Sequence, residues 1–169
     1  MNDEAIGAWE ASALMGLHWS RPAKMSEAGT ISSRVVGSTE ERTFAVYSRA
    51  ECEQNYKDYM ANRVPTRRPR TALDNRPEIL RILGQKDRPK IAYGDAISVY
   101  EAAKILGVWW TLVPRLAKEG KIVGRVLHSG RQNSSRLWVI SRQSCETHGA
   151  DVSRQEQAGT KRGRPRTAC

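Results

Sequence analysis

The residues most able to do chemistry are basic side chains on a short segment that we expect to be helical. Arg115 and Lys118 follow Thr111, a residue type suited to begin a helix. A guanidinium group can donate two parallel hydrogen bonds to a guanine edge, and an ammonium group attracts phosphate. Backbone amides at a helix start can also point at a phosphate. This pattern indicates contact with duplex DNA, and its alternative is a pair of merely solvated cations.

Similar basic residues recur in four other parts of the chain. The further candidate DNA contacts lie on an earlier helix, in the linker, in a loop and in the C-terminal tail: Arg21, Lys24, Arg67, Arg68, Arg70, Arg131, Arg136, Arg162, Gly163, Arg164 and Arg166. The loop at 128–136 has no acidic residue and suits contact with phosphates or a minor groove; its alternative is a polar hairpin tip. The linker arginines fit two roles equally well. They are suited to contact the phosphate backbone of DNA along its length, or simply to keep the linker soluble.

The positive charge is concentrated in particular segments. The 169 residues include 28 Lys and Arg against 18 Asp and Glu, a formal net charge of +10. Residues 1–62 carry a net charge of −3, whereas residues 63–90, 91–150 and 151–169 carry +6, +4 and +3. A polyanionic partner explains this surplus most simply. Because residues 1–62 are acidic, we expect residues 91–150 to bind DNA more strongly than residues 1–62 do.

The chain contains an internal repeat. Residues 5–36 align with residues 96–127 without a gap, and about a third of the positions are identical. The match resumes between residues 46–53 and residues 139–146. Two copies of one module are therefore expected.

Each copy is predicted to hold two helices, a two-stranded hairpin and a closing helix. Apolar spacing predicts the first helices at 9–15 and 100–106, with stops at Gly16 and Gly107. The remaining predicted elements are second helices from the N-caps Ser20 and Thr111 to Gly29 and Gly120, strand pairs at 31–36 with 43–47 and at 122–127 with 136–140, and closing helices after Ser48 and Ser141. This order predicts an α+β fold of two winged helix-turn-helix domains.

The second copy carries the patterns Glu101-Ala102-Ala103-x-x-Leu106-Gly107-Val108 and Arg115-Leu116-x-x-Glu119-Gly120-Lys121-Ile122. These patterns resemble the helix-turn-helix module of the MerR and phage-excisionase type, and the resemblance extends to both copies. It implies that the second helix of the module enters the major groove of DNA.

Apolar side chains around the turn are expected to form the core. Leu112, Val113 and Leu116 are expected to face inward, which leaves the basic side chains of that helix for DNA. Trp19 and Trp110 occupy matching positions in the two copies, and we expect them to be either core residues or residues that staple the turn.

The C-terminal segment reads Lys161-Arg162-Gly163-Arg164-Pro165-Arg166-Thr167 and resembles an AT-hook. Gly163 would let the backbone sit deep in an A·T-rich minor groove, and Pro165 would hold it extended. We expect residues 151–169 to be a disordered basic tail when free.

The linker is predicted to contain a short helix at 75–84, with Asn75 as its cap and Gly84 as its stop. Its apolar side needs a partner surface. We expect this helix either to dock one module on the other or to form a homodimer contact.

Several classes of function find no support in the sequence. No run reaches the 18 or so apolar residues of a membrane helix, and the acidic N-terminus is unlike a secretory signal. Three cysteines, Cys52, Cys145 and Cys169, are too few and too scattered for a disulfide framework. No catalytic, metal-binding or cofactor-binding constellation stands out, so we expect neither an enzyme nor a cofactor.

The sequence therefore predicts a first module at 1–62, a basic linker at 63–90, a second module at 91–150 and a tail at 151–169. The expected function is sequence-preferring binding of double-stranded DNA in the cytoplasm, at the nucleoid, as a transcriptional regulator of a bacterium, phage or mobile element. The alternatives are a DNA-bending factor in recombination or packaging, and an adaptor or inhibitor that grips a host protein through the first module.

Overall fold

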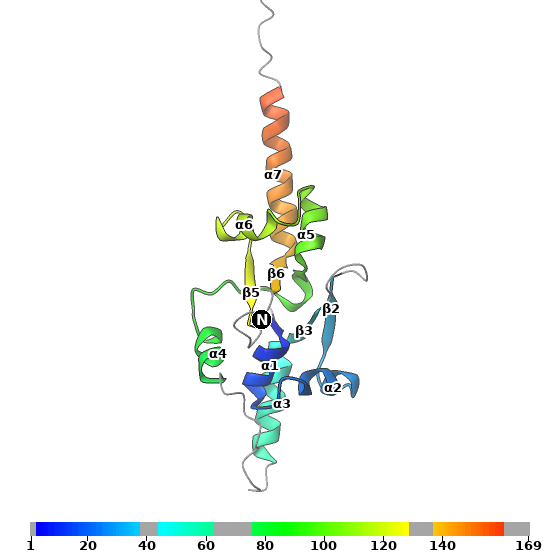
Figure 1. Cartoon of the computed structure of the whole chain (residues 1–169), viewed down its shortest axis with the longest axis vertical. Coiled ribbons are helices and arrows are strands. Elements are labelled where there is room, and N and C mark those ends of the chain that lie inside the picture. The colour runs from blue at the N-terminus through cyan, green and yellow to red at the C-terminus, as the bar shows by residue number, and fades with distance from the viewer. Residues whose placement is uncertain (1–2, 38–43, 63–75, 129–136, 161–169) are drawn as a thin grey trace, which may run out of the picture.

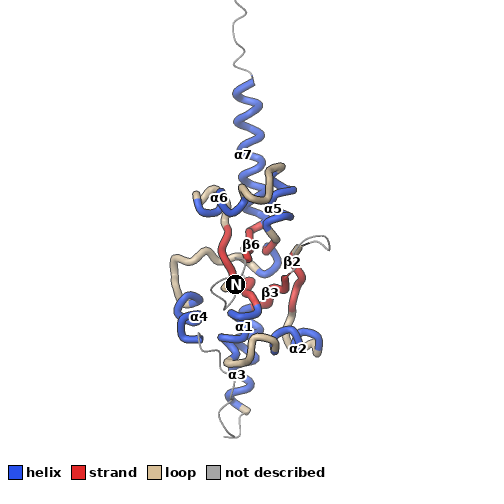
Figure 2. The backbone as a smooth tube through the Cα atoms, viewed as in Figure 1, coloured by secondary structure: helices blue, strands red, loops and turns tan. Residues whose placement is uncertain are grey.

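The computed structural model describes residues 3–37, 44–62, 76–128 and 137–160, with side chains up to Asp151 (Figure 1). This part of the chain is a mixed α+β structure with seven α-helices and two three-stranded antiparallel sheets. The sheets lie in the middle of the molecule, and helices flank them (Figure 2). No helix in these ranges combines the length and the apolar character that crossing a bilayer requires.

The two halves of the chain share one order of elements. The first half contains β1 (Ala5–Gly7), α1 (Ala8–Met15), α2 (Arg21–Glu27), β2 (Ser33–Val36), β3 (Phe44–Ser48) and α3 (Arg49–Ala61). After α4 (Arg76–Leu83) and a 3₁₀ turn (Tyr93–Asp95), the second half contains β4 (Ala96–Ile97), α5 (Val99–Leu106), α6 (Val113–Lys118), β5 (Gly124–Leu127), β6 (Leu137–Ser141) and α7 (Arg142–Thr160). The strand orders β1-β3-β2 and β4-β6-β5 correspond strand for strand.

Glycines end the first helix of each half, as the sequence predicts. Gly16 and Gly107 have φ values of 66° and 65°, a left-handed conformation that side chains with a Cβ rarely adopt. At the start of α5, the Glu101 N–H donates to Ser98 Oγ over 3.1 Å, and the Ser98 N–H donates to Glu101 Oε2 over 2.8 Å. These caps fix where the chain enters and leaves α5.

Each sheet has a third strand that is not expected from the sequence. The expected strand pairs are confirmed as β2 with β3 and β5 with β6. In addition, β1 pairs with β3 and β4 pairs with β6, both antiparallel. β1 and β4 have three and two residues, and all of them are buried. Strands this short and buried on both faces show no apolar–polar alternation, so the sequence gives no signal for them.

The last helix is longer than expected. The sequence predicts disorder from residue 151, but α7 continues through Thr160. Helix-favouring Arg, Gln, Glu and Ala residues dominate residues 154–158. Because a packed helix already precedes them, these residues only have to extend it and no new helix has to nucleate.

The linker helix α4 packs on the first half. Its apolar side chains Ile79 and Leu83 are buried in the same core cluster as residues of α1. The Arg76 Nε donates to the Ala13 carbonyl over 2.8 Å, and its guanidinium lies 6.0 Å from the Tyr56 ring centre. The buried side of α4 is therefore used within the chain, so this side does not supply the homodimer contact considered above.

The two sheets pack face to face. In the first sheet, Ile6 and Tyr47 point toward the helices of their own half. The opposite face of that sheet, with Val36 and Val46, shares one apolar cluster with Leu127 and with other residues of the second sheet. Each sheet thus packs one face against its own helices and the other against the opposite half.

Arginines on the edge strands β2 and β5 complete this contact. The Arg125 Nη2 donates to the Ala5 carbonyl over 2.6 Å, and its Nη1 donates to Glu10 Oε1 over 2.7 Å. The Arg34 Nη2 donates to the carbonyl oxygens of Ala96 and Tyr93. The side chains of Arg125 and Glu10 are only 4% and 1% exposed, so this ion pair is shielded from water.

A second acid, Glu4, adds to the buried charge network. Its carboxylate lies 2.9 Å from Arg49, 2.5 Å from Arg88 and 3.6 Å from Arg125. Burial, followed by the neighbouring Arg125 guanidinium, lowers the pKa of Arg88 from its ordinary value. Both effects oppose its positive charge, and the nearby carboxylates of Glu4 and Glu10 offset them only in part.

Replacing Arg125 by Met should strongly destabilise the protein, because Glu10 would keep a buried charge without its partner. We expect a loss of about 3–5 kcal/mol in the free energy of unfolding, measured by urea denaturation. The exposed Arg142→Met variant, a control of the same chemistry, should change it by less than about 0.5 kcal/mol. A loss under about 1 kcal/mol for Arg125→Met would show that the sheet contact does not depend on this pair.

The buried thiols of Cys52 and Cys145 should resist alkylation in the folded protein. Burial raises the pKa of Cys52 to about 12 and that of Cys145 to about 11, so almost no reactive thiolate forms near neutral pH. In a Cys169→Ser variant at mildly alkaline pH, neither thiol should react with iodoacetamide until urea unfolds the chain. Because both pKa values are raised, the folded thiols should stay protonated through the ordinary thiol pKa, and this protection should fall only as pH approaches about 11. Rapid labelling of a folded sample at neutral pH would contradict the burial of these residues.

Candidate nucleic-acid interface

Helix α6 is held by apolar side chains on one face only. Val113 is fully buried, and Leu116 and Ala117 pack half-buried on the same core cluster. These positions are spaced as i, i+3 and i+4 and therefore form one stripe along the helix. The opposite face of α6 is left for side chains that point to solvent.

The candidate contacts of α6 lie on that exposed face. The side chain of Arg115 is 75% exposed, and Thr111 and Lys118 are also exposed. The sequence predicts the helix N-cap at Thr111, but α6 begins at Val113 and its N-cap is Leu112. Thr111 therefore lies in the turn before the helix. The matching residue Ser20 does occupy the N-cap of α2, although its side chain makes no capping hydrogen bond.

An acidic residue sits among these cations. The Arg115 Nε donates to Glu119 Oε1 over 2.8 Å, and Lys121 Nζ lies 2.9 Å from Glu119 Oε2. Hydrogen bonds from Lys121 and from Arg115 lower the pKa of the Glu119 carboxyl. Glu119 thus stays ionised at neutral pH and competes with any phosphate for Arg115. Sequence reasoning missed Lys121, although its place after Gly120 in the quoted pattern marks the end of this helix.

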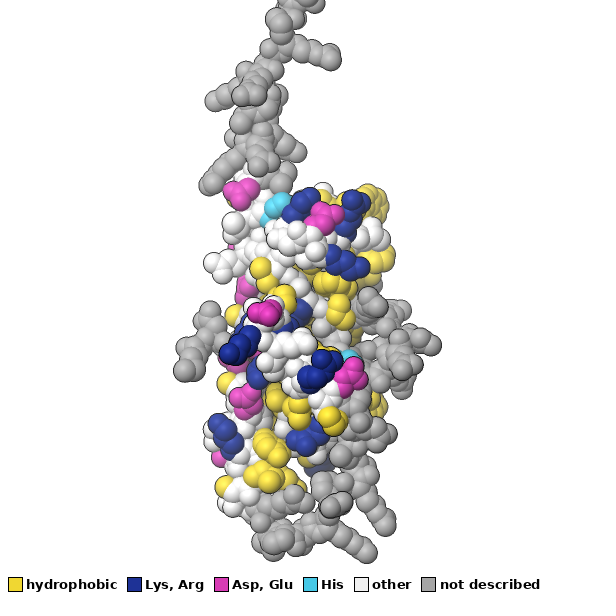
Figure 3. Space-filling view, turned by 90° about the vertical axis from the view of Figure 1, so that its left-hand side faces the viewer, with side chains coloured by type: hydrophobic (Ala, Val, Ile, Leu, Met, Phe, Trp, Pro, Cys, Tyr) yellow, Lys and Arg dark blue, Asp and Glu magenta, His cyan; other side chains and the backbone are white. Residues whose placement is uncertain are grey.

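Apolar side chains border the basic face. Trp109 is 78% exposed, Trp110 is 47% exposed and Leu112 is 41% exposed. Figure 3 shows the side of the molecule where α6 lies; at the upper end of the described surface, basic side chains surround an acidic one and adjoin hydrophobic side chains. Thr111 does not begin the helix, so the apolar stripe starts at Val113 and Leu112 lies outside it. The expectation that Leu112 faces the core is therefore wrong.

The matched tryptophans are not core residues either. Trp19 is 45% exposed and stacks on Trp9 at 6.0 Å between ring centres and 11° between planes. Trp110 lies 5.4 Å from the Tyr100 ring at 40°. Each indole therefore contacts an aromatic residue of the preceding helix and stays partly in water. This arrangement staples the turn, as expected, but does not bury the indole.

The first half presents a related but weaker surface on α2. Arg21 and Lys24 are exposed, and so is Glu27 on the same helix. Pro22 is buried at the start of α2. Figure 1 places α2 and α6 at opposite corners of the molecule, so their basic residues form two separate patches.

The remaining predicted contacts lie outside the described residues. They are Arg67, Arg68 and Arg70 in the linker, Arg131 and Arg136 in the loop, and Arg162, Gly163, Arg164 and Arg166 in the tail. Two other arginines of the basic surplus, Arg34 and Arg125, have structural partners between the halves.

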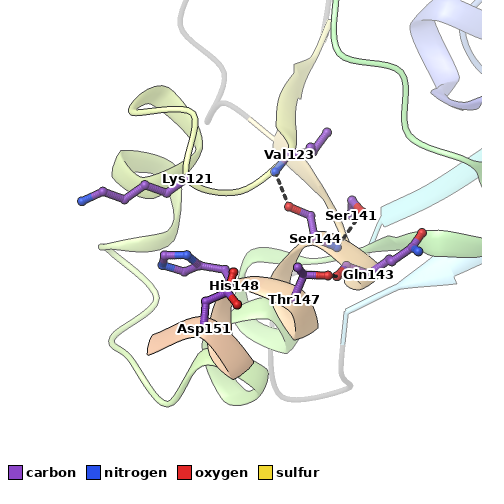
Figure 4. A pocket seen from close by; sticks show the side chains of 8 residues that line it. All are labelled: Lys121, Val123, Ser141, Gln143, Ser144, Thr147, His148 and Asp151. Carbon is purple, nitrogen blue, oxygen red and sulfur yellow. Dashed lines mark hydrogen bonds between the residues drawn. The ribbon is translucent and has the colours of Figure 1, made fainter. Parts of the chain in front are cut away.

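A pocket of about 360 Å³ lies between β6 and the start of α7, beside Lys121 (Figure 4). Its hydroxyl groups are engaged by the backbone, because Ser144 Oγ accepts from the Val123 N–H over 2.7 Å and Ser141 Oγ accepts from the Ser144 N–H over 3.1 Å. Figure 4 places His148 next to Asp151 at the rim. Across the described ranges, no group of three or more His, Cys, Asp or Glu side chains is placed to hold a metal ion. These hydroxyls cap and position strand and helix ends.

Comparisons with known proteins identify no family. No protein-family model matches the chain, and no curated protein sequence matches it.

Proposed function

We propose that this protein binds double-stranded DNA with sequence preference and acts as a transcriptional regulator of a bacterium, phage or mobile element. In this proposal each half is a winged helix-turn-helix module, and α6 enters the major groove. The observation that carries the proposal is the two-sided character of α6. Its apolar stripe anchors it to the core, and Arg115 and Lys118 stand on the free side.

The surrounding elements support this assignment. Helix α5, a turn and α6 are followed directly by the antiparallel pair β5 and β6. A helix of this kind fits the width of the major groove, and a hairpin beside it can approach the neighbouring backbone. Arg131 and Arg136 in the connecting loop are proposed to contact phosphates there.

The linker arginines and the tail are proposed to add affinity. A basic segment tethered to a bound module experiences a high effective concentration of DNA, so weak contacts add substantially to binding. The tail residues Arg162, Gly163 and Arg164 are proposed to lie in an A·T-rich minor groove.

Removing both cations from α6 should reduce affinity and selectivity together. After a preferred site is found by random-oligonucleotide selection, the Arg115→Ala/Lys118→Ala variant should lose roughly tenfold or more of its preference for that site over a scrambled duplex, because the loss of a base contact costs about 1–3 kcal/mol. Fluorescence anisotropy measures both affinities. The Lys86→Ala/Lys90→Ala variant removes the same charge from exposed positions after α4 and should keep the preference.

Removing an acidic charge from the same surface should have the opposite effect on affinity for DNA. Glu119→Gln releases Arg115 from its ion pair and removes a charge that repels phosphate, so affinity for DNA should rise.

An unchanged site preference in the Arg115→Ala/Lys118→Ala variant would refute the placement of α6 in the groove. A protein that bound no duplex at about 100 mM salt would refute the proposed function itself.

Deleting residues 161–169 should weaken binding and flatten its salt dependence. Each lost phosphate contact removes roughly 0.9 from the slope of log affinity against log salt. Deleting only residues 167–169, which carry no basic side chain, serves as the control. Equal slopes for the two truncations would mean that the tail does not touch DNA.

A further inference from the structure

The contacts between the two halves are reciprocal. Arg34 and Arg125 occupy matching positions in the repeat, and so do Ala5 and Ala96. The Arg125 guanidinium donates to the Ala5 carbonyl, and the Arg34 guanidinium donates to the Ala96 carbonyl. When residue i of one copy contacts residue j of the other and j contacts i in return, the copies are related by a two-fold axis. Copies stacked head to tail would use two different surfaces instead.

The apolar core between the sheets has the same symmetry. It takes Val36 from the first half and the matching Leu127 from the second, and it takes Val46 together with its counterpart Val139. Both halves therefore offer the same face to each other.

The arrangement of the helices agrees. In Figure 1, α3 runs toward the bottom and α7 toward the top, and α2 and α6 lie at the lower right and the upper left. A half turn about the line of sight exchanges these pairs.

This symmetry constrains the DNA that both helices can read. A half turn leaves the direction along its axis unchanged and reverses every direction across it. Hence α2 and α6 present the same side along the axis but run in opposite senses across it. Where their exposed faces point toward the same end of that axis, two surfaces related in this way read two half-sites of opposite orientation on one duplex, because the symmetry of the site mirrors that of the protein.

We propose that a single chain recognises an inverted repeat, with α6 on one half-site and α2 on the other, at a fixed spacing. This inference rests on the proposed function and specifies its substrate. Modules on a flexible tether would accept direct and inverted sites at several spacings. Here the buried Glu10–Arg125 pair and the shared sheet core hold the halves together, so only one orientation fits.

The two half-sites are unlike. Lys24 of α2 corresponds to Arg115 of α6, and Glu27 corresponds to Lys118. Arg115 can bind a guanine edge through two hydrogen bonds, which Lys24 reproduces only as a point charge. Glu27 repels phosphate and can accept a hydrogen bond from cytosine. Lys118 attracts phosphate and can donate a hydrogen bond to guanine. The inverted repeat is therefore imperfect, and its α6 half contributes more of the affinity.

Random-oligonucleotide selection with the whole chain tests this proposal. The enriched sequences should contain two related elements in opposite orientation at one spacing, and native mass spectrometry should show one chain per duplex. Anisotropy is then measured on four duplexes: the selected site, the site with one half reversed, the site with roughly 5 base pairs inserted to rotate one half by about half a turn, and the α6 half alone. The last three should bind with similar affinity, roughly 10²-fold below that of the selected site.

Two variants assign the halves. Lys24→Ala should lower affinity for the selected site but leave binding to the α6 half-site unchanged, whereas Arg115→Ala should lower both. Enrichment of a direct repeat, of a lone half-site, or of a symmetric site occupied by two chains would overturn the inverted-repeat proposal and leave DNA binding intact. If no duplex is enriched, the proposed function fails with it.

Discussion

The structure depends on the contact between two sheet faces that neither half can leave exposed. Each three-stranded sheet of this protein carries apolar residues on both faces, and each half provides helices for only one of them. The other face must be covered, and the second copy of the repeat covers it. Apolar packing alone would let the two sheets slide past each other. The arginines at the margin of the contact prevent this, because their hydrogen bonds are directional. Arg125 reaches both Glu10 and the Ala5 carbonyl, and this hydrogen-bonding geometry fixes the register.

The same contact changes how the net charge should be understood. Arg125 and Arg88 are almost fully buried, and Arg34 and Arg49 are partly buried against carbonyl oxygens or carboxylates. These cations stabilise the fold and are not free for a polyanion. Among described residues, the cations proposed for DNA are smaller sets on α6 and α2, and on α6 the acid Glu119 moderates the charge. The basic residues thus serve two purposes: some stabilise the fold, and others form the surface proposed to bind DNA.

Much of the local structure was predictable from single residues, whereas the pairing of the halves was not. Gly16, Gly107 and the serine N-cap of α3 have strong conformational preferences that neighbours hardly alter, so their positions were correctly predicted. β1 and β4 were missed because such short strands are stabilised by their neighbours and carry no alternation of their own. An arginine in a strand is usually exposed, so residue type alone offers no reason to place Arg125 between the sheets.

The candidate site was predicted only in part. Arg115 and Lys118 are exposed on a helix as expected, because their spacing from the apolar stripe decides their direction. The start of α6 was misplaced, and the roles assigned to Thr111 and Leu112 followed that error. The half-exposure of Trp19 and Trp110 was not predictable from residue type, because it depends on how closely each ring covers the aromatic residue below it.

The place of α4 has a consequence for synthesis on the ribosome. The core of the first half includes Ile79 and Leu83, and the Ala5 N–H donates to the Ile91 carbonyl. A nascent chain that has just completed α3 therefore still lacks part of that core, and one face of its first sheet waits for the second half to emerge. Folding of this protein is expected to lag behind elongation until most of the chain has left the exit tunnel.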